Sequence, residues 1–137
     1  MDAASRLVPG LPSVAGGKSF GGRMTSQAQA EKPLPGVAGL VFFGFPLHPA
    51  GKPSDERAAH LVAVKVPMLF LQGTRDALAD MDLLMAMIAG LGRRAKLSAV
   101  DGADHSFHVP ARSGKTDAAV MGEMLDVMAG WVEGLER

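Results

Sequence analysis

Apolar runs separated by polar, proline-rich or glycine-rich turns divide the chain into alternating strands and helices. Continuous apolar runs at residues 37–45 and 66–73 are typical of strands buried on both faces of a parallel sheet. A shorter run at residues 11–18 predicts another strand. Residues 95–100 alternate between apolar and polar positions, which predicts a strand at the sheet edge, with one face less buried.

Apolar positions recurring every three or four residues predict the helices between these strands. Helices are expected from about residue 20 to 31, from 54 to 62, from 78 to 91 and from 117 to 135. The last carries the single tryptophan, Trp131, on its apolar stripe, and we interpret this residue as part of the core.

This alternation favours βα units around a parallel sheet. We predict one α/β domain over residues 1–137, a three-layer α/β/α sandwich with about four parallel strands in chain order. The strand at residues 11–18 would then form one edge. Its unpaired backbone groups predict a homo-oligomer, or membership of a longer polypeptide, through this edge.

Composition narrows the function classes. The chain has 14 basic and 14 acidic residues, so no single-sign field is available to hold nucleic acid or an anionic membrane. It has no cysteine, which excludes disulfides and thiolate chemistry, and no pair of histidines has a convincing metal-ligand spacing. No signal peptide and no apolar run of about 18 residues is found. We expect a cytoplasmic protein without metal or cofactor.

The stretch from Gly17 to Gly21 reads G-x-S-x-G, the pattern of a nucleophile elbow. In an elbow, the serine, here Ser19, sits on a sharp strand-to-helix turn above the end of a parallel sheet. We expect that a side chain at Gly17 or Gly21 would obstruct this turn. A phosphate-binding loop is an alternative interpretation of the same residues, but its pattern requires glycine where Pro12 stands.

Ser19, Asp76 and His105 each follow the end of a predicted strand, in the chain order serine, aspartate, histidine. That is the order of the α/β-hydrolase triad. Histidine can deprotonate the serine hydroxyl near neutral pH, and the carboxylate orients the imidazole. Asp76 could instead cap the helix that follows it, with Asp80 as the alternative acid. His108 is the alternative base.

Further candidates lie close to these positions. The backbone N–H of Phe20, at the start of the elbow helix, is the expected oxyanion donor. Phe45, His48 and His108 are candidate substrate-pocket residues, because ligands of open α/β sheets bind beyond the C-terminal ends of the strands. Asp104 is expected either to cap its loop or to bias the imidazole electrostatically.

The triad order, the elbow, and the segments at residues 69–76 and 104–107 together resemble the α/β-hydrolase superfamily. Within it, the chain is similar to the dienelactone-hydrolase-like predicted hydrolases, a group that resembles a testis-expressed protein and a chromatin-complex subunit's hydrolase-like domain. The resemblance implies that Ser19 is the nucleophile, Asp76 the acid, His105 the base and Phe20 an oxyanion donor. It also implies only the C-terminal half of such a fold, because several strands usually precede the elbow strand.

The leading hypothesis is therefore a serine hydrolase that cleaves a small-molecule ester, thioester or lactone through an acyl-serine intermediate. The resemblance implies weak activity for a chain that lacks the loop that supplies the second oxyanion donor. The alternative is a non-catalytic, hydrolase-like domain used for protein interaction.

Overall fold

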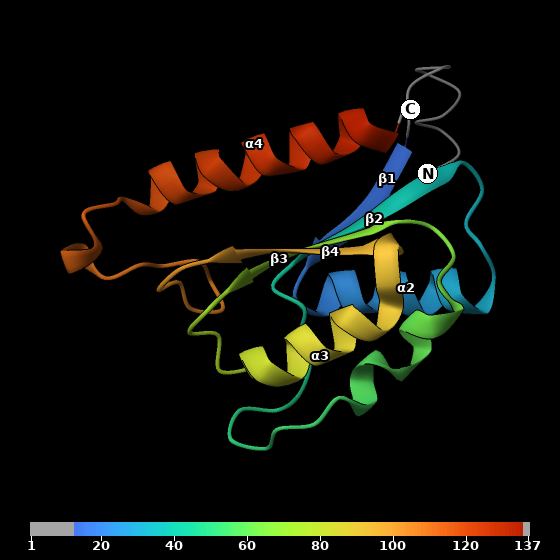
Figure 1. Ribbon diagram of the computed structural model, residues 1–137, viewed down its shortest axis with the longest axis horizontal. Helices are drawn as coiled ribbons and strands as arrows, with labels where there is room; N and C mark the ends of the chain where they lie inside the picture. The colour runs from blue at the N-terminus through green and yellow to red at the C-terminus, as the bar shows by residue number, and fades with distance from the viewer. Residues whose placement is uncertain (1–12, 136–137) are drawn as a thin grey trace.

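The computed structural model describes residues 13–135, which form one sheet between two helical layers (Figure 1). Residues 11 and 12 of the first predicted strand lie outside the described residues. The elements, in chain order, are β1 (Ser13–Lys18), α2 (Phe20–Glu31), β2 (Val37–Phe43), the 3₁₀ helix η1 (Glu56–Ala63), β3 (Met68–Gly73), α3 (Met81–Leu91), the 3₁₀ turn η2 (Gly92–Arg94), β4 (Ala95–Val100), the 3₁₀ turn η3 (Ala111–Ser113) and α4 (Asp117–Leu135).

The four strands pair in parallel in the order β1-β2-β3-β4, which confirms the predicted sheet. The register places Phe42 between Gly17 of β1 and Phe70 of β3. Within the described residues, β1 and β4 are thus the two edges. The elbow strand is an edge strand here, as predicted from the chain order.

The continuous apolar runs are explained by burial on both faces of the sheet. Phe42 and Phe70 point into one core cluster, where their ring centroids lie 4.7 Å apart. Their neighbours Val41 and Leu69 point into the opposite cluster. Because successive strand side chains alternate between faces, each layer receives half of every strand. Figure 1 shows α4 on one face and α2, α3 and η1 on the other.

Several predicted boundaries were wrong for local reasons. Strand β2 ends at Phe43 and not at residue 45, because Gly44 adopts a positive φ of 75° and turns the chain away. Helix α3 begins at Met81 and not at Leu78, since the side chain of Asp80 caps it by accepting a hydrogen bond from the Leu83 N–H. The segment after Asp55 is a 3₁₀ helix.

Helix α4 has the predicted bounds, and part of its predicted stripe faces the sheet. Val120 and Met124 are buried and Trp131 packs against the same cluster, but Leu125, which the apolar spacing also assigns to the stripe, is exposed. Leu125 is one position out of step with the buried face, so it points away. No helix among the described residues is both long and apolar enough to cross a membrane.

The parallel arrangement brings the C-terminal ends of all four strands to one edge of the sheet. Ser19 follows β1, Asp76 follows β3 and His105 follows β4. The segment that leaves β2 also runs past this edge, where Gly44 lies against the ring of His105. Three sequence-distant side chains are therefore placed within reach of one another.

Candidate active site

Ser19 sits on a strained turn between β1 and α2. Its φ of 53° and ψ of −121° are unusual for a residue with a side chain. The turn is held by the Ser19 N–H, which donates to the Phe43 carbonyl at 2.9 Å and so continues the pairing with β2. The helix begins at the next residue, Phe20. This strand–turn–helix geometry is what the G-x-S-x-G pattern predicted.

The glycine that closes this turn is Gly22, and the expectation for Gly21 was wrong. A β-carbon on Gly22 would lie 2.6 Å from the Gly17 carbonyl oxygen, whereas one on Gly21 would meet nothing within 4 Å. A β-carbon on Gly17 would in turn lie 3.0 Å from the Gly22 nitrogen. The first turn of α2 thus rests directly on β1, and two glycines permit it.

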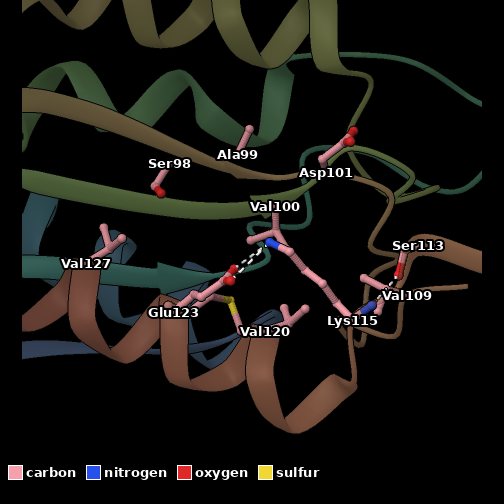
Figure 2. Close-up of a pocket in the computed structure, with 11 residues that line it drawn as sticks. Ser98, Ala99, Val100, Asp101, Val109, Ser113, Lys115, Val120, Glu123 and Val127 are labelled. Atoms are coloured by element: carbon pink, nitrogen blue, oxygen red, sulfur yellow. Dashed lines mark hydrogen bonds and ion pairs between the residues drawn. The ribbon is translucent and has the colours of Figure 1, made fainter. Parts of the chain in front are cut away.

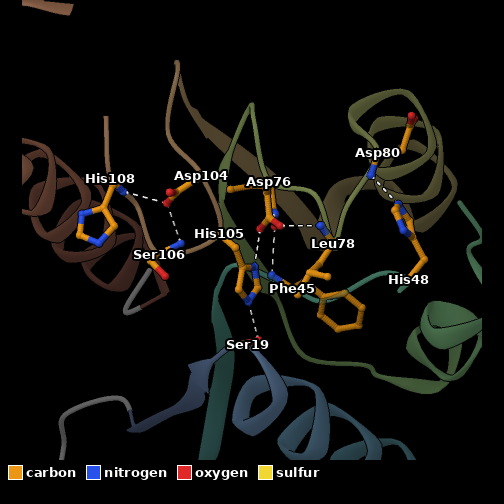
Figure 3. Close-up of polar contacts among 11 residues, drawn as sticks. Ser19, Phe45, His48, Asp76, Leu78, Asp80, Asp104, His105, Ser106 and His108 are labelled. Atoms are coloured by element: carbon orange, nitrogen blue, oxygen red, sulfur yellow. Dashed lines mark hydrogen bonds and ion pairs between the residues drawn. The ribbon is translucent and has the colours of Figure 1, made fainter. Parts of the chain in front are cut away.

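Asp76 is a buried carboxylate that accepts three hydrogen bonds. Its Oδ2 accepts from His105 Nδ1 at 2.6 Å and from Gln72 Nε2 at 2.7 Å, and its Oδ1 accepts from the Leu78 N–H at 2.8 Å. Only 5% of the residue is exposed. The two candidate acids therefore have different roles: Asp80 caps α3, and Asp76 faces the histidine (Figure 3).

His105 joins Asp76 to Ser19. Its Nε2 lies 2.6 Å from the Ser19 Oγ, and its Nδ1 lies 2.6 Å from the Asp76 Oδ2. Figure 3 shows the imidazole between the other two side chains. An ionised carboxylate can only accept, so Nδ1 carries the proton and Nε2 accepts from the serine hydroxyl. In this tautomer, His105 is oriented to remove the Ser19 proton.

The loop that carries His105 is fixed against the end of β3. The Arg75 N–H donates to the Ala103 carbonyl at 2.9 Å. A β-carbon on Gly73 would lie 2.3 Å from the same oxygen, so only glycine permits this close approach. Asp104 caps the loop, because its Oδ1 accepts from the N–H groups of Ser106 and His108. Of its two predicted roles, the structure shows the capping one.

Gln72 is a polar member of the site that the sequence analysis missed. It is fully buried near the end of β3. Its Oε1 accepts from the Phe45 N–H at 3.0 Å, and its Nε2 donates to Asp76. The sequence did contain a signal for this role, because Gln72 is a polar residue inside an otherwise apolar strand, shortly before Asp76.

His108 does not reach Ser19. Its Nδ1 lies 2.5 Å from the Asp117 Oδ2 at the start of α4, and both side chains are exposed. The hydrogen bond with Asp117 raises the pKa of His108, and the negative charges of Asp117 and Asp104 raise it further. The same hydrogen bond lowers the pKa of Asp117. The structure therefore places His108 in a surface ion pair with α4.

The other candidates have distinct positions. His48 is 3% exposed, and both its ring nitrogens meet backbone groups: Nε2 accepts from the Asp80 N–H and Nδ1 contacts the Pro49 carbonyl. This leaves neither nitrogen free for a ligand.

Phe45 is fully buried in the core. Phe20 exposes 62% of its surface, and its N–H lies in the first turn of α2, where no intrahelical acceptor exists.

A pocket of about 360 Å³ opens elsewhere, between β4 and α4 (Figure 2). Three charged residues line it: Asp101, and the pair Lys115 and Glu123, which lie 3.0 Å apart. None of the predicted site residues lines it. Within residues 13–135, no three histidine, aspartate or glutamate side chains converge to hold a metal ion. Among the described residues, Ser19, His105 and Asp76 form a continuous chain of side-chain hydrogen bonds, and this chain is the candidate site.

Known structures share this fold. An α/β serine hydrolase homologue from Coxiella burnetii is 23% identical, covering 69% of this chain and 41% of its own, with a TM-score of 0.56. The esterase domain of a Rhodothermus marinus protein is 18% identical, covering 93% and 66%, with a TM-score of 0.60. A dienelactone hydrolase-like promiscuous phosphotriesterase from metagenomic libraries is 19% identical, covering 89% and 52%, with a TM-score of 0.61.

The chain thus spans between 41% and 66% of the length of these three structures. At sequence identities this low, the similarity to these three structures shows a shared fold only. The family is shown by a separate match of the sequence itself. Residues 2–133 match the family described as the Alpha/beta hydrolase domain. With nearly its whole length matched, this chain belongs to the Alpha/beta hydrolase domain family.

Proposed function

We propose that this protein is a serine hydrolase that cleaves a small-molecule ester, thioester or lactone through an acyl-serine intermediate. The observation that carries the proposal is the unbroken hydrogen-bond chain from Ser19 Oγ through His105 to Asp76, with 2.6 Å at each step. Nucleophile, base and orienting acid are the three parts that this chemistry needs.

In the acylation step, Ser19 Oγ attacks the substrate carbonyl carbon while its proton passes to His105 Nε2. Asp76 stabilises the imidazolium that forms. The tetrahedral intermediate collapses as the leaving group departs with the proton from His105. Water then attacks the acyl-serine, again giving its proton to His105, and the acid product leaves as Ser19 regains its hydrogen.

The oxyanion is stabilised by the Phe20 N–H, whose place at the N-terminus of α2 adds the positive end of the helix dipole. The second donor of an elbow hydrolase comes from a loop between an earlier strand and helix. The described part of the chain begins with the elbow strand, so it supplies no such loop. Losing one donor typically costs on the order of 10²–10³ in turnover, so we expect residues 13–135 alone to turn over slowly.

The resemblance to dienelactone-hydrolase-like proteins extends this proposal to lactones as well as open esters. The dienelactone hydrolase-like neighbour from metagenomic libraries is consistent with that choice. The alternative of a non-catalytic interaction domain has less support, because such a domain has no need of the Ser19–His105–Asp76 chain.

A fluorophosphonate probe followed by peptide mapping tests the proposal, since the probe reacts with an activated serine even when turnover is slow. We expect labelling of Ser19 that is lost in Ser19→Ala. His105→Ala should abolish labelling, whereas His108→Ala should leave most of it, because His108 pairs with Asp117. Labelling that persists in Ser19→Ala, or that maps to Ser106 or Ser113, would overturn the assignment.

A further inference from the structure

We infer that Gln72 is a positioning residue: it holds Asp76 as an ionised acceptor and thereby sets the tautomer of His105. The inference rests on the proposed function, since it assigns a role within that same site. Its starting point is the placement of the Gln72 amide, which is fully buried and bonded at both ends.

The orientation of this amide is dictated by a group that cannot change its role. The Phe45 backbone N–H can only donate, so the atom that it meets at 3.0 Å must be the carbonyl oxygen of Gln72. The amide NH₂ is then the end that faces Asp76, where it donates to Oδ2 at 2.7 Å. A flipped amide would set two donors against each other at Phe45.

The amide end in turn fixes the carboxylate. Its Oδ2 accepts hydrogen bonds from Gln72 and His105, while its Oδ1 accepts one from the Leu78 N–H. Both oxygens of Asp76 therefore accept hydrogen bonds from donors. A proton on Oδ2 would oppose the Gln72 NH₂. Asp76 thus acts as an acceptor only.

The carboxylate then fixes the histidine. With Oδ2 as acceptor, the proton of His105 stays on Nδ1, and Nε2 is left to accept from Ser19. The direction of every hydrogen bond from Phe45 to Ser19 thus follows from one backbone N–H. The same segment also confines the imidazole, because Gly44 precedes Phe45 and lies against the His105 ring.

Substitution of Gln72 by methionine tests the inference, because methionine keeps the approximate length and removes both hydrogen bonds. The matched control is Gln29→Met. Gln29 is also buried, and its Oε1 accepts from the Leu34 N–H at 2.9 Å, outside the site. Each variant leaves one backbone N–H without its partner, that of buried Phe45 in Gln72→Met and that of half-buried Leu34 in Gln29→Met. Gln29→Met therefore controls for the general cost of losing such a bond.

Two measurements separate this inference from the proposed function. Nitrogen-15 NMR of the free protein reports the His105 tautomer without any reaction, and the rate of fluorophosphonate labelling reports Ser19. We expect wild type and Gln29→Met to show the Nδ1–H tautomer, and Gln72→Met to show a mixture with labelling slowed about 10- to 100-fold. An unlabelled wild type whose tautomer still depends on Gln72 contradicts only the hydrolase proposal.

Gln72→Glu provides a second variant should Gln72→Met fail to fold. Its carboxyl can accept from Phe45 and, when protonated, donate to Asp76 as the amide does. Two adjacent carboxylates raise the pKa at which this shared proton is lost. We expect Gln72→Glu to label at mildly acidic pH and to lose labelling as the pH rises, where wild type keeps it. A single Nδ1–H tautomer in Gln72→Met, or a wild-type pH profile in Gln72→Glu, overturns the inference.

Discussion

Gly22 of helix α2 lies against the carbonyl oxygen of Gly17 in β1: a β-carbon on Gly22 would stand 2.6 Å from that oxygen. The contact sets the angle at which α2 leaves the sheet. Because Ser19 lies between the two glycines, the same contact sets the position of its hydroxyl. One added methyl group should therefore disturb both folding and the site.

We predict that Gly22→Ala lowers the free energy of unfolding by about 1–3 kcal/mol, since the methyl group overpacks the turn. It should also slow fluorophosphonate labelling. Gly21→Ala is the matched control, because its methyl group meets open space and alanine favours a helix by about 1 kcal/mol over glycine. Urea denaturation measures both variants. Equal effects of the two substitutions would contradict the role given to Gly22.

A second prediction separates the two aspartates. Asp76→Asn should slow Ser19 labelling by several orders of magnitude, on the order of 10⁴, because an amide favours the wrong His105 tautomer. Asp80→Ala should leave labelling unchanged. It should lower the free energy of unfolding by about 1 kcal/mol, because it removes the helix cap, the carboxylate that accepts from the Leu83 N–H. Labelling and urea denaturation of both variants form the test. A labelling rate that depends on Asp80 and not on Asp76 would exchange their roles.

A third prediction concerns pH and the His108–Asp117 pair. The raised pKa of His108 gives stability that is fully present below its unfolded value of 6.5 and lost as the pH rises through the folded pKa. The lowered pKa of Asp117 gives stability that is present above 3.8 and lost as the pH falls through its folded pKa. The pair should therefore stabilise most at about pH 5.

Urea denaturation of wild type and His108→Gln across the pH range measures this effect. The difference between them should be largest near pH 5 and should vanish in alkaline solution. His60 is the comparison, because burial, aided by the charge of Arg23, lowers its pKa. The contribution of neutral His60 to the free energy of unfolding should be complete above pH 6.5 and fall as the solution is acidified. A His108 difference that grows with pH would contradict the ion pair.

The three residues proposed for catalysis could be selected from the sequence because each lies within a few residues of the C-terminal end of a strand. Parallel strands bring their C-terminal ends together, so Ser19, Asp76 and His105 converge wherever the loops are short. The choice between His105 and His108 needed the structure. The two histidines lie three residues apart, and the turn between them, with Phe107 at a φ of 63°, points one toward Asp76 and the other toward Asp117.

Gln72 could not be predicted in the same way, since its role depends on a partner 27 residues distant. In the sequence it occupies a strand position that reads as core. The crowded glycine was also misassigned for a spatial reason. The G-x-S-x-G pattern counts along the chain, whereas the approach of α2 to β1 selects Gly22, which lies beyond the motif.

The last prediction concerns the free edge of β1, whose only strand partner among the described residues is β2. A groove of about 460 Å³ opens beside it, lined by Val14, Ala15, Gly16, Met24, Thr25, Ala28 and Leu34. Unpaired backbone groups next to apolar surface favour pairing with another strand. We propose that a second copy of the chain occupies this edge, with the two β1 strands antiparallel about a two-fold axis.

Light scattering across a concentration series should then show a dimer, and the β1 amides that point away from β2 should be protected from hydrogen exchange. Met24→Lys should shift the equilibrium toward monomer, because Met24 lines the groove, is 48% exposed, and a buried ammonium there would lose its hydration. Met85→Lys is the control: Met85 is 54% exposed on α3, away from the groove, so the dimer should persist. A wild type that stays monomeric, with free exchange of the β1 amides that point away from β2, would rule out the pairing. A dimer insensitive to Met24→Lys would place the interface on another surface.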